Sequence, residues 1–171
     1  ELKKEFLDLV KFGYERELLV SKISEVSVRT RGDFFLTHKT NRIFRNLILS
    51  DLEIHSINIS RSEESLDGLR HMDWHRVIYQ NLNANTVVIS HPKNIFAYLP
   101  TSDQDTFESL IETFEFLLKV KIKSADEVPE VFLMNQFTFI PGHGLVAWGD
   151  QLGKLLADLE YLDWICSINN R

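Results

Sequence analysis

The chain has 171 residues, of which 44% are hydrophobic and 26% are charged, and its formal net charge at pH 7 is −6. The hydrophobic fraction is too high for a disordered chain, and no run of about 18 apolar residues is present that would cross a membrane. The acidic balance leaves little electrostatic drive for binding nucleic acid, so we expect neither nucleic acid nor a membrane as partner. Cys166 is the only cysteine, which excludes an internal disulfide and is typical of a reducing, cytoplasmic location. The length fits one domain over residues 1–171.

The N-terminal third predicts a helix followed by a β-hairpin. Apolar residues recur at helical spacing from the start of the chain, which indicates a helix or a helix pair that ends at about Lys22. Residues 26–29 alternate between apolar and polar, residues 31–33 are typical of a turn, and residues 34–37 are again apolar. A further strand is expected around residues 54–59.

The middle of the chain predicts a buried strand between helices. Residues 60–67 predict a polar loop and residues 69–82 a helix. The β-branched run at residues 86–89 is typical of a strand that is buried on both faces. Further helices are expected from about Asn94 and over residues 105–119.

The C-terminal third predicts strands and a long amphipathic helix. Residues 131–134, 137–140 and 145–148 predict three strands, with a tight turn at residues 142–144. Strands interleaved with helices indicate a single α/β domain in which helices cover a sheet. The final helix has the clearest period of all, and its apolar stripe consists of Leu152, Leu155, Leu156, Leu159, Leu162 and Cys166.

Four of the six histidines are candidates for a functional site. His91 directly follows the predicted buried strand, and strand ends are a usual place for ligands in α/β folds. His143 lies between two glycines, where a sharp turn can direct the imidazole into a cleft. His71 and His75 are four residues apart and share one face of a helix, a spacing that metal ligands also use. A single histidine at a strand end or in a turn is more often a packed or capping residue than a functional one.

Five segments occur in the order and at the approximate spacing of one known family. Residues 24–29 resemble a Gly-Asn-(Val/Ile/Leu)-Ser-x-Arg motif, and residues 35–40 resemble a strand and loop that end in Thr-Pro-Ser-Gly. Residues 75–79 resemble a helix that follows a catalytic glutamate, residues 85–91 an Ala-Val-Val-His-x-His strand, and residues 141–149 an Asn-His-Gly motif. The chain therefore resembles the class II aldolase/adducin family. The resemblance implies a mainly antiparallel central β-sheet covered by helices on both faces.

The resemblance also implies a chemistry and an assembly. In this family three histidines hold a zinc ion, which acts as a Lewis acid on the carbonyl and hydroxyl of the substrate and stabilises an enediolate. A glutamate moves the proton, and loops rich in Gly, Asn and Ser bind the substrate phosphate. Relatives assemble as rings, commonly as tetramers, so a homo-oligomer is expected here.

The positions that match the zinc site are only partly kept. The first histidine of the His-x-His motif is replaced by Ile89, whereas the second and third zinc histidines match His91 and His143. The catalytic glutamate is replaced by His71. Two interpretations remain open: His71, His91 and His143 form a rearranged three-histidine metal site, or the histidines are relics in a partly filled pocket and zinc is absent or weakly bound.

The positions that match the phosphate-binding loops are rewritten. Ser24 and Glu25 stand where the family has Gly-Asn, and Lys39 and Thr40 stand where it has Ser-Gly. Arg70 occupies the second position of a Ser-Ser pair. The carboxylate of Glu25 repels a phosphate dianion at close range. The cations Lys39 and Arg70 can offset this repulsion, but the resulting site differs from the phosphate site of the family.

These changes favour a divergent family member whose zinc and phosphate sites are degraded. We therefore expect a scaffold or small-ligand-binding protein rather than a working sugar-phosphate aldolase. The alternative is a metal-dependent lyase, aldolase or epimerase that acts on a small hydroxy-carbonyl compound or sugar phosphate. In that alternative His71 and Asp73 are the catalytic candidates, Glu25 is a further carboxylate available for proton transfer, and His75 supports the metal ligands.

Overall fold

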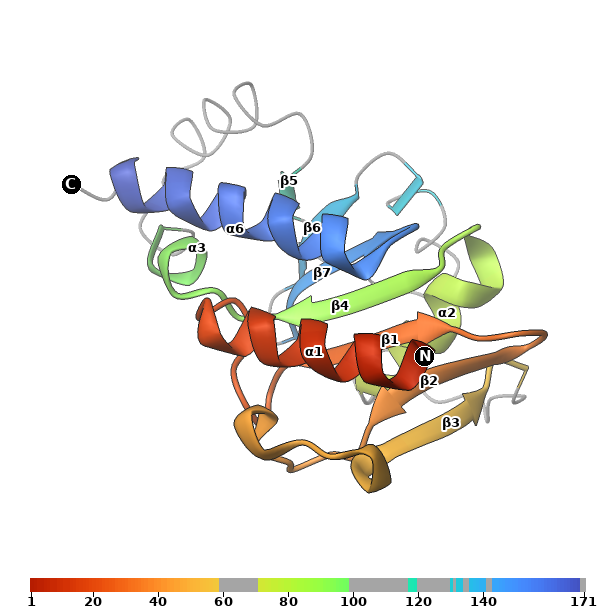
Figure 1. Ribbon diagram of the computed structural model, residues 1–171. Coiled ribbons are helices and arrows are strands. Elements are labelled where there is room, and N and C mark those ends of the chain that lie inside the picture. Colours follow the sequence, from red (N-terminus) through yellow and green to blue (C-terminus); the bar gives the residue numbers. More distant parts are fainter. Residues whose placement is uncertain are drawn as a thin grey trace.

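A computed structural model describes residues 1–58, 71–98, 117–119, 130, 132–133, 136–140 and 143–169. Within these residues the strands form one seven-stranded sheet in the order β3-β2-β1-β4-β7-β6-β5 (Figure 1). Neighbouring strands are antiparallel throughout, except that β5 and β6 are parallel. The strands are β1 (Glu25–Arg29), β2 (Phe34–His38), β3 (Leu52–Ser56), β4 (Thr86–Ser90), β5 (Leu117–Lys119), β6 (Phe137–Ile140) and β7 (Gly144–Gly149).

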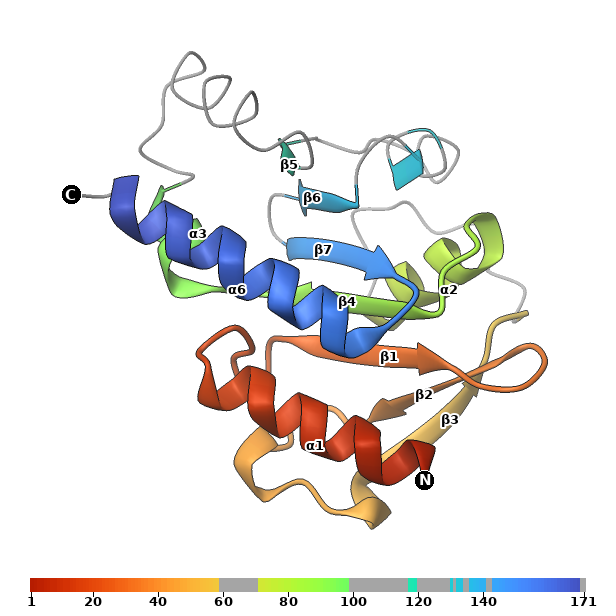
Figure 2. The same cartoon turned by 45° about the horizontal axis from the view of Figure 1, so that its top comes forward.

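Helices cover both faces of this sheet, as the resemblance implied. The helix α1 (Leu2–Glu15) and the long C-terminal helix α6 (Leu152–Asn169) lie side by side on one face, and α2 (His71–Asn81) lies on the other (Figures 1 and 2). A short helix, α3 (Lys93–Tyr98), follows β4 and packs against α6. Two single-turn 3₁₀ helices, at Phe44–Asn46 and Leu49–Asp51, connect β2 to β3. None of the helices in the described ranges is long and apolar enough to cross a membrane.

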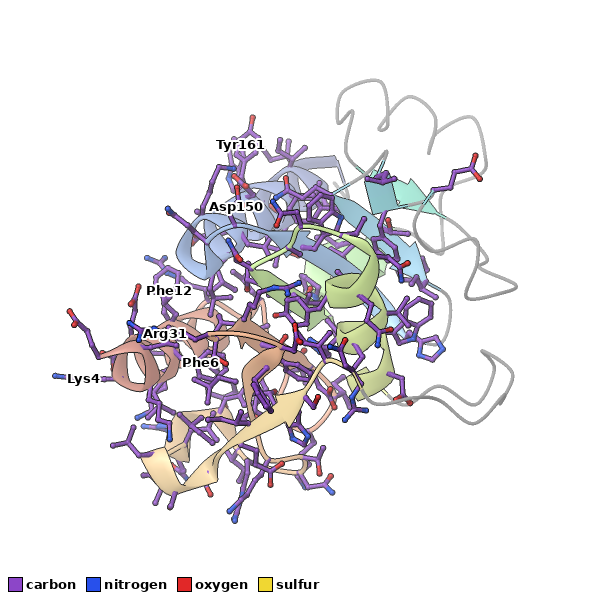
Figure 3. The ribbon with its side chains drawn as sticks, turned by 90° about the vertical axis from the view of Figure 1, so that its right-hand side faces the viewer. Lys4, Phe6, Phe12, Arg31, Asp150 and Tyr161 are labelled. Carbon is purple, nitrogen blue, oxygen red and sulfur yellow. The ribbon has the colours of Figure 1, made fainter. Side chains whose placement is uncertain are left out.

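The sheet separates two hydrophobic clusters, which follow from the alternation of side chains along each strand. In β4, Val88 packs on the side of α1 and α6, whereas Val87 and Ile89 pack on the side of α2. Every residue of β4 is buried, which explains its β-branched composition and confirms the predicted buried strand. Figure 3 shows the same division on α1, where Phe6 points toward the sheet and Lys4 points outward.

The predicted hairpin and the predicted C-terminal helix are both present. β1 and β2 pair in antiparallel register, with Val28 opposite Leu36, and Gly32 takes a φ of 71° in the connecting turn. The full apolar stripe of α6 is buried, from Leu152 to Cys166. The buried thiol has its pKa raised to about 12, first by loss of hydration and then by Asp163, so it stays protonated at neutral pH.

The N-terminal helix is shorter than predicted. α1 ends at Glu15, and the backbone of Glu17 and Lys22 has positive φ values of 60° and 76°, which a helix does not allow. The N–H groups of Leu18 and Leu19 both bond to the carbonyl of Gly13, which closes the helix end. Both leucines are nevertheless buried. Their apolar side chains continue the helical spacing, which is why the sequence predicts a longer helix.

Two further predictions near the C-terminal third are wrong where the structure describes the residues. Phe132 and Leu133 are helical, not part of a strand at 131–134, with Phe132 buried and Leu133 exposed. Residues 117–119, predicted as the end of a helix, form β5 and pair with β6. Short apolar runs fit a helix or a strand equally well. For residues 117–119, pairing with β6 favours the strand. The predicted loop at 60–67, Ile59 and residues 105–116 lie outside the described residues.

Candidate functional site

His91 and His143 come together at the end of the sheet where β4 ends and β7 begins. Gly144 follows His143 directly, and a Cβ atom placed on this glycine would lie 2.7 Å from Nε2 of His91 and 2.9 Å from the carbonyl oxygen of Ser90. The φ of Gly144 is 111°, a value that L side chains rarely adopt. Glycine at this position therefore allows the imidazole of His91 to lie against the turn that carries His143.

Neighbouring side chains hold both imidazoles, which are half-buried. Nδ1 of His91 lies 3.4 Å from Oγ of Ser24, and its ring packs on Phe96 at a centroid distance of 5.1 Å. The ring of His143 meets the buried Trp74 of α2 edge to face at 5.5 Å. The structure thus brings His91, His143 and Ser24 to one corner.

Glu25 and His75 form the second part of this corner, on the face covered by α2. Oε2 of Glu25 lies 3.7 Å from Nε2 of His75, with the Glu25 side chain 12% exposed and the His75 side chain 0% exposed. Burial, followed by the nearby charge of Asp73, raises the pKa of Glu25 to about 7. Asp73 itself pairs with Arg76 at 3.2 Å on the same helix.

A buried hydrogen-bonded chain continues from His75 into the core. Nδ1 of His75 lies 2.6 Å from Oγ of Ser27, which lies 2.7 Å from the hydroxyl of Tyr79. The ring of Phe35 stacks on His75 at 6.2 Å. Sequence reasoning missed Ser27 and Tyr79 as partners of His75. The available signals were the i, i+4 spacing of His75 and Tyr79 on one helix and the serine of the Ser-x-Arg motif on the strand beneath them.

Ile89 occupies the position that the resemblance gives to the first zinc histidine. Its side chain is fully buried, and it is the register partner of Glu25 across β1 and β4. An isoleucine offers no donor atom to a metal. Among the side chains that the structure describes, no three His, Cys, Asp or Glu groups are arranged to hold a metal ion. His71 begins α2, but its side chain is not among those described.

The positions matched to the phosphate loops do not converge as a set. Ser24 lies beside His91, and its hydroxyl oxygen accepts a hydrogen bond from the backbone N–H of Val20. Lys39 donates from Nζ to the carbonyl of Ser50, so its ammonium group is bonded to the loop between β2 and β3. Thr40 is exposed, and Arg70 lies outside the described residues.

Two hollows in the described part of the surface lie elsewhere. One, of about 450 Å³, lies between the N-terminal ends of α1 and α6 and reaches Arg29. The other, of about 480 Å³, lies along α6 beside Tyr161 and Trp164. Neither is lined by the histidines or by Glu25.

Comparison with known proteins places this arrangement in a family. The model of the class II aldolase and adducin N-terminal domain matches residues 4–169, which is nearly the whole chain. The chain belongs to the class II aldolase and adducin family. No curated protein matched by sequence.

Solved structures of this family share the fold of the chain. An L-fuculose-1-phosphate aldolase from Thermus thermophilus is 20% identical, with a TM-score of 0.68 over 96% of this chain and 92% of that one. The L-fuculose 1-phosphate aldolase from Glaciozyma antarctica is 15% identical, with a TM-score of 0.73 over 98% and 71%. A sugar-phosphate aldolase from Thermotoga maritima is 13% identical, with a TM-score of 0.71 over 97% and 92%. At these identities the likeness shows the fold and leaves the chemistry to the residues of this chain.

Proposed function

We propose that this protein uses the class II aldolase scaffold for a scaffolding or small-ligand-binding role and does not carry out zinc-dependent cleavage of sugar phosphates. The observation that carries this proposal is Ile89, a fully buried apolar side chain at the position matched to a zinc histidine. Two histidines, His91 and His143, leave a tetrahedral zinc site short of the three protein ligands that catalytic sites use.

Glu25 supports the same proposal because its charge disfavours a phosphorylated substrate. Its carboxyl group is nearly closed to water and lies near a second carboxylate, Asp73. Above its pKa of about 7 the carboxylate of Glu25 is charged, and a phosphate dianion brought to this place then meets repulsion that little solvent screens. The corner therefore suits a neutral or positively charged small ligand better than a sugar phosphate.

Restoring the lost ligand tests the proposal directly. We expect the wild-type protein, incubated with zinc, to show no cleavage of L-fuculose 1-phosphate above the buffer background. Ile89→His should raise the zinc affinity at least about tenfold, measured by titration calorimetry, because it supplies a third imidazole beside His91. Val88→His is the matched control, since Val88 points to the opposite face of the sheet and should leave the zinc affinity unchanged. Zinc-dependent cleavage by the wild-type protein would overturn the proposal.

One observation favours a second candidate, a metal-dependent lyase or epimerase with His71, His91 and His143 as ligands. The close approach of His91 to Gly144 brings two of these three histidines to one corner. The test is elemental analysis of untagged protein purified without chelators, with His71→Ala and His91→Ala alongside. Near-stoichiometric zinc that both variants lose would establish this second candidate, whereas protein without metal after incubation with excess zinc would remove it.

The proposal also includes a homo-oligomer, a tetramer by analogy with the family, and a cytoplasmic location. The acidic charge and the single buried cysteine are compatible with both.

A further inference from the structure

The strand β3 forms one edge of the sheet, and in the described ranges no strand pairs with its outer side (Figure 2). An exposed strand edge pairs readily with other chains, so proteins usually protect it with lysine, proline, a bulge or a covering element. The sequence of β3, Leu-Glu-Ile-His-Ser, contains neither lysine nor proline, and all of its residues pair with β2 in unbroken register. β3 is therefore a regular edge strand without these protective residues.

The backbone groups on the outer side of β3 are identified by the hydrogen bonds at its two ends. The carbonyl of Asp51 and the N–H of Ile57 both bond to residues that flank β2. Because the direction of these groups alternates along a strand, the N–H and carbonyl groups of Leu52, Ile54 and Ser56 point outward. Ile54 is 55% exposed, so the middle of this edge is accessible.

Two of the outward groups already have partners within the chain. The N–H of Leu52 bonds to the carbonyl of Leu49, and the carbonyl of Ser56 accepts a hydrogen bond from Nε of Arg76. The carbonyl of Leu52, both backbone groups of Ile54 and the N–H of Ser56 have no such bond among the residues that the structure describes. These groups are open to a further strand.

The charged side chains of β3 are complementary to those of a second, antiparallel copy of the same strand. When two copies pair about Ile54, Glu53 of each copy lies opposite His55 of the other. Within one chain, Oε2 of Glu53 already lies 3.1 Å from Nε2 of His55, so carboxylates and imidazoles alternate across the pair. A register centred on Glu53 or on His55 instead places that residue opposite itself, which loses the complementarity.

The backbone groups match in the same register. Leu52 lies opposite Ser56 of the second copy, so the N–H and the carbonyl that already have partners face each other. The open carbonyl of Leu52 faces the open N–H of Ser56. The Ile54 residues exchange both of their backbone hydrogen bonds. Every outward group of β3 is then satisfied.

Apolar side chains also meet across such a pair. Leu36 is buried and is the register partner of Ile54, so Leu36 and Ile54 of one copy continue directly into Ile54 and Leu36 of the other. Phe34, which is 47% exposed, is the register partner of Ser56 and lies in the row that Leu52 of the second copy extends. Pairing therefore removes exposed apolar surface from water.

We infer that β3 is a self-association edge, at which two copies of this chain pair antiparallel about a two-fold axis through Ile54 and join their sheets into one. The inference rests on the homo-oligomer of the proposed function and specifies one of its contacts. Such a contact is closed, because each copy has one β3 and the pair uses the outer side of both. The occupant is a second copy because the complementary charges and backbone groups belong to β3 itself.

A disulfide across the two-fold axis tests this pairing. Ile54→Cys places two thiols on residues whose Cα atoms lie about 5.5 Å apart in a hydrogen-bonded antiparallel pair, a distance that a disulfide bridges. With oxidised glutathione as the oxidant, we expect most of the variant to run as a covalent dimer in non-reducing gel electrophoresis. The wild-type protein should form none, because the thiol of Cys166 is buried and protonated. Leu133→Cys, at a residue outside β3 that is 68% exposed, is the control for random collisions.

Exchange of the charges tests the register. Glu53→His alone and His55→Glu alone each place like groups opposite each other, so each should weaken self-association about threefold or more in analytical ultracentrifugation. The double variant restores opposite groups and should recover the wild-type association. Ile54→Lys brings two ammonium groups together on the axis and should weaken association at least about tenfold, whereas Leu133→Lys should leave it unchanged. Circular dichroism checks that each variant is folded.

The outcomes separate this inference from the homo-oligomer on which it rests. A wild-type mass equal to one chain removes both. An oligomer whose mass survives Ile54→Lys, and in which Ile54→Cys cross-links no faster than Leu133→Cys, keeps the homo-oligomer and overturns the pairing through β3. A mass of two chains that falls to one chain with Ile54→Lys supports the pairing and removes the tetramer.

Discussion

At Glu25 a carboxyl group is nearly closed to water, and the physical consequence is a dependence of stability on pH. Its pKa is about 7 in the folded protein and 4.5 as the ordinary value, because burial and Asp73 both disfavour the charged form. The folded state therefore holds this proton more tightly than the unfolded state does. The stabilisation is fully present below about pH 4.5 and is lost as the pH rises through about 7.

Glu25→Gln should remove this dependence. We expect the variant to be more stable than the wild type at about pH 8 by on the order of 2 kcal/mol, and the difference to shrink toward zero at about pH 4.5. Urea unfolding of both proteins at several pH values measures it, because the contributions of groups that do not interact with Glu25 cancel in the difference. A difference that stays constant with pH would show that Glu25 keeps its ordinary pKa.

Gly144 makes a second prediction at the scale of a single residue. Gly144→Ala adds a Cβ that meets Nε2 of His91 at 2.7 Å and the backbone oxygen of Ser90 at 2.9 Å, in addition to the strain of a positive φ. Gly32→Ala is a matched control, since Gly32 also has a positive φ but has nothing within 4 Å of the added Cβ. We expect thermal unfolding to show a loss of about 1–2 kcal/mol for Gly32→Ala and on the order of 3 kcal/mol for Gly144→Ala. Equal losses would mean that His91 moves aside without cost.

Single residues of the candidate site were predictable only where a local pattern marked them. His91 follows an unmistakable buried strand, and His143 lies between glycines, so sequence reasoning selected both. Ser27 and Tyr79 were missed because their role arises only when β1 and α2 pack together. The same packing turns His75, predicted as a supporting residue, into the centre of the buried chain.

Elements were predictable where burial follows one regular pattern along the whole element. β4 is buried at every residue and α6 buries a complete stripe, so composition and period decide these two elements. β5 was mistaken for the end of a helix because its strand structure depends on pairing with β6, which lies about 20 residues later in the chain. Phe132 and Leu133 are helical but were predicted as part of a strand. A short apolar run is compatible with either structure, and its sequence alone does not show which one its neighbours in the fold favour.

The stripe of α6 carries a quantitative prediction for the element. Leu159 is fully buried and belongs to the cluster between α1, α6 and the sheet. Leu159→Ala should destabilise the protein by roughly 2–5 kcal/mol, since it removes buried methyl groups and leaves a cavity. Lys154→Ala on the exposed side of the same helix should change stability by less than about 0.5 kcal/mol. Chemical denaturation measures both, and similar values for the two variants would mean that α6 does not pack as described.

For the whole molecule, the outer side of α6 bears on assembly. Tyr161 and Trp164 stack on each other at 6.1 Å, and both are more than half exposed in the single chain. Ile168, one turn further along the helix, is also exposed. Large exposed apolar groups on one side of a helix are more typical of contact surfaces than of isolated chains.

From the proposed tetramer, which rests on analogy with the family, we expect the purified protein to have about four times the mass of one chain in light scattering coupled to size exclusion. Trp164→Ala should shift this mass downward if the outer side of α6 contributes to the contact. Leu133→Ala, at another exposed apolar residue, serves for comparison. A wild-type mass equal to one chain would refute the expected assembly.

The strand order has a consequence for how the chain is made. The three adjacent central strands, β1, β4 and β7, begin at residues 25, 86 and 144, so neighbours in the sheet are separated by about 60 residues along the chain. During synthesis on a ribosome, β1, β2 and β3 can pair early as a meander, but β4 has only one partner until β7 has emerged. The side of the sheet that α6 covers stays exposed until α6, which follows β7 in the chain, has also emerged. Such non-local pairing slows folding and leaves apolar surface of the nascent chain exposed until α6 has been made.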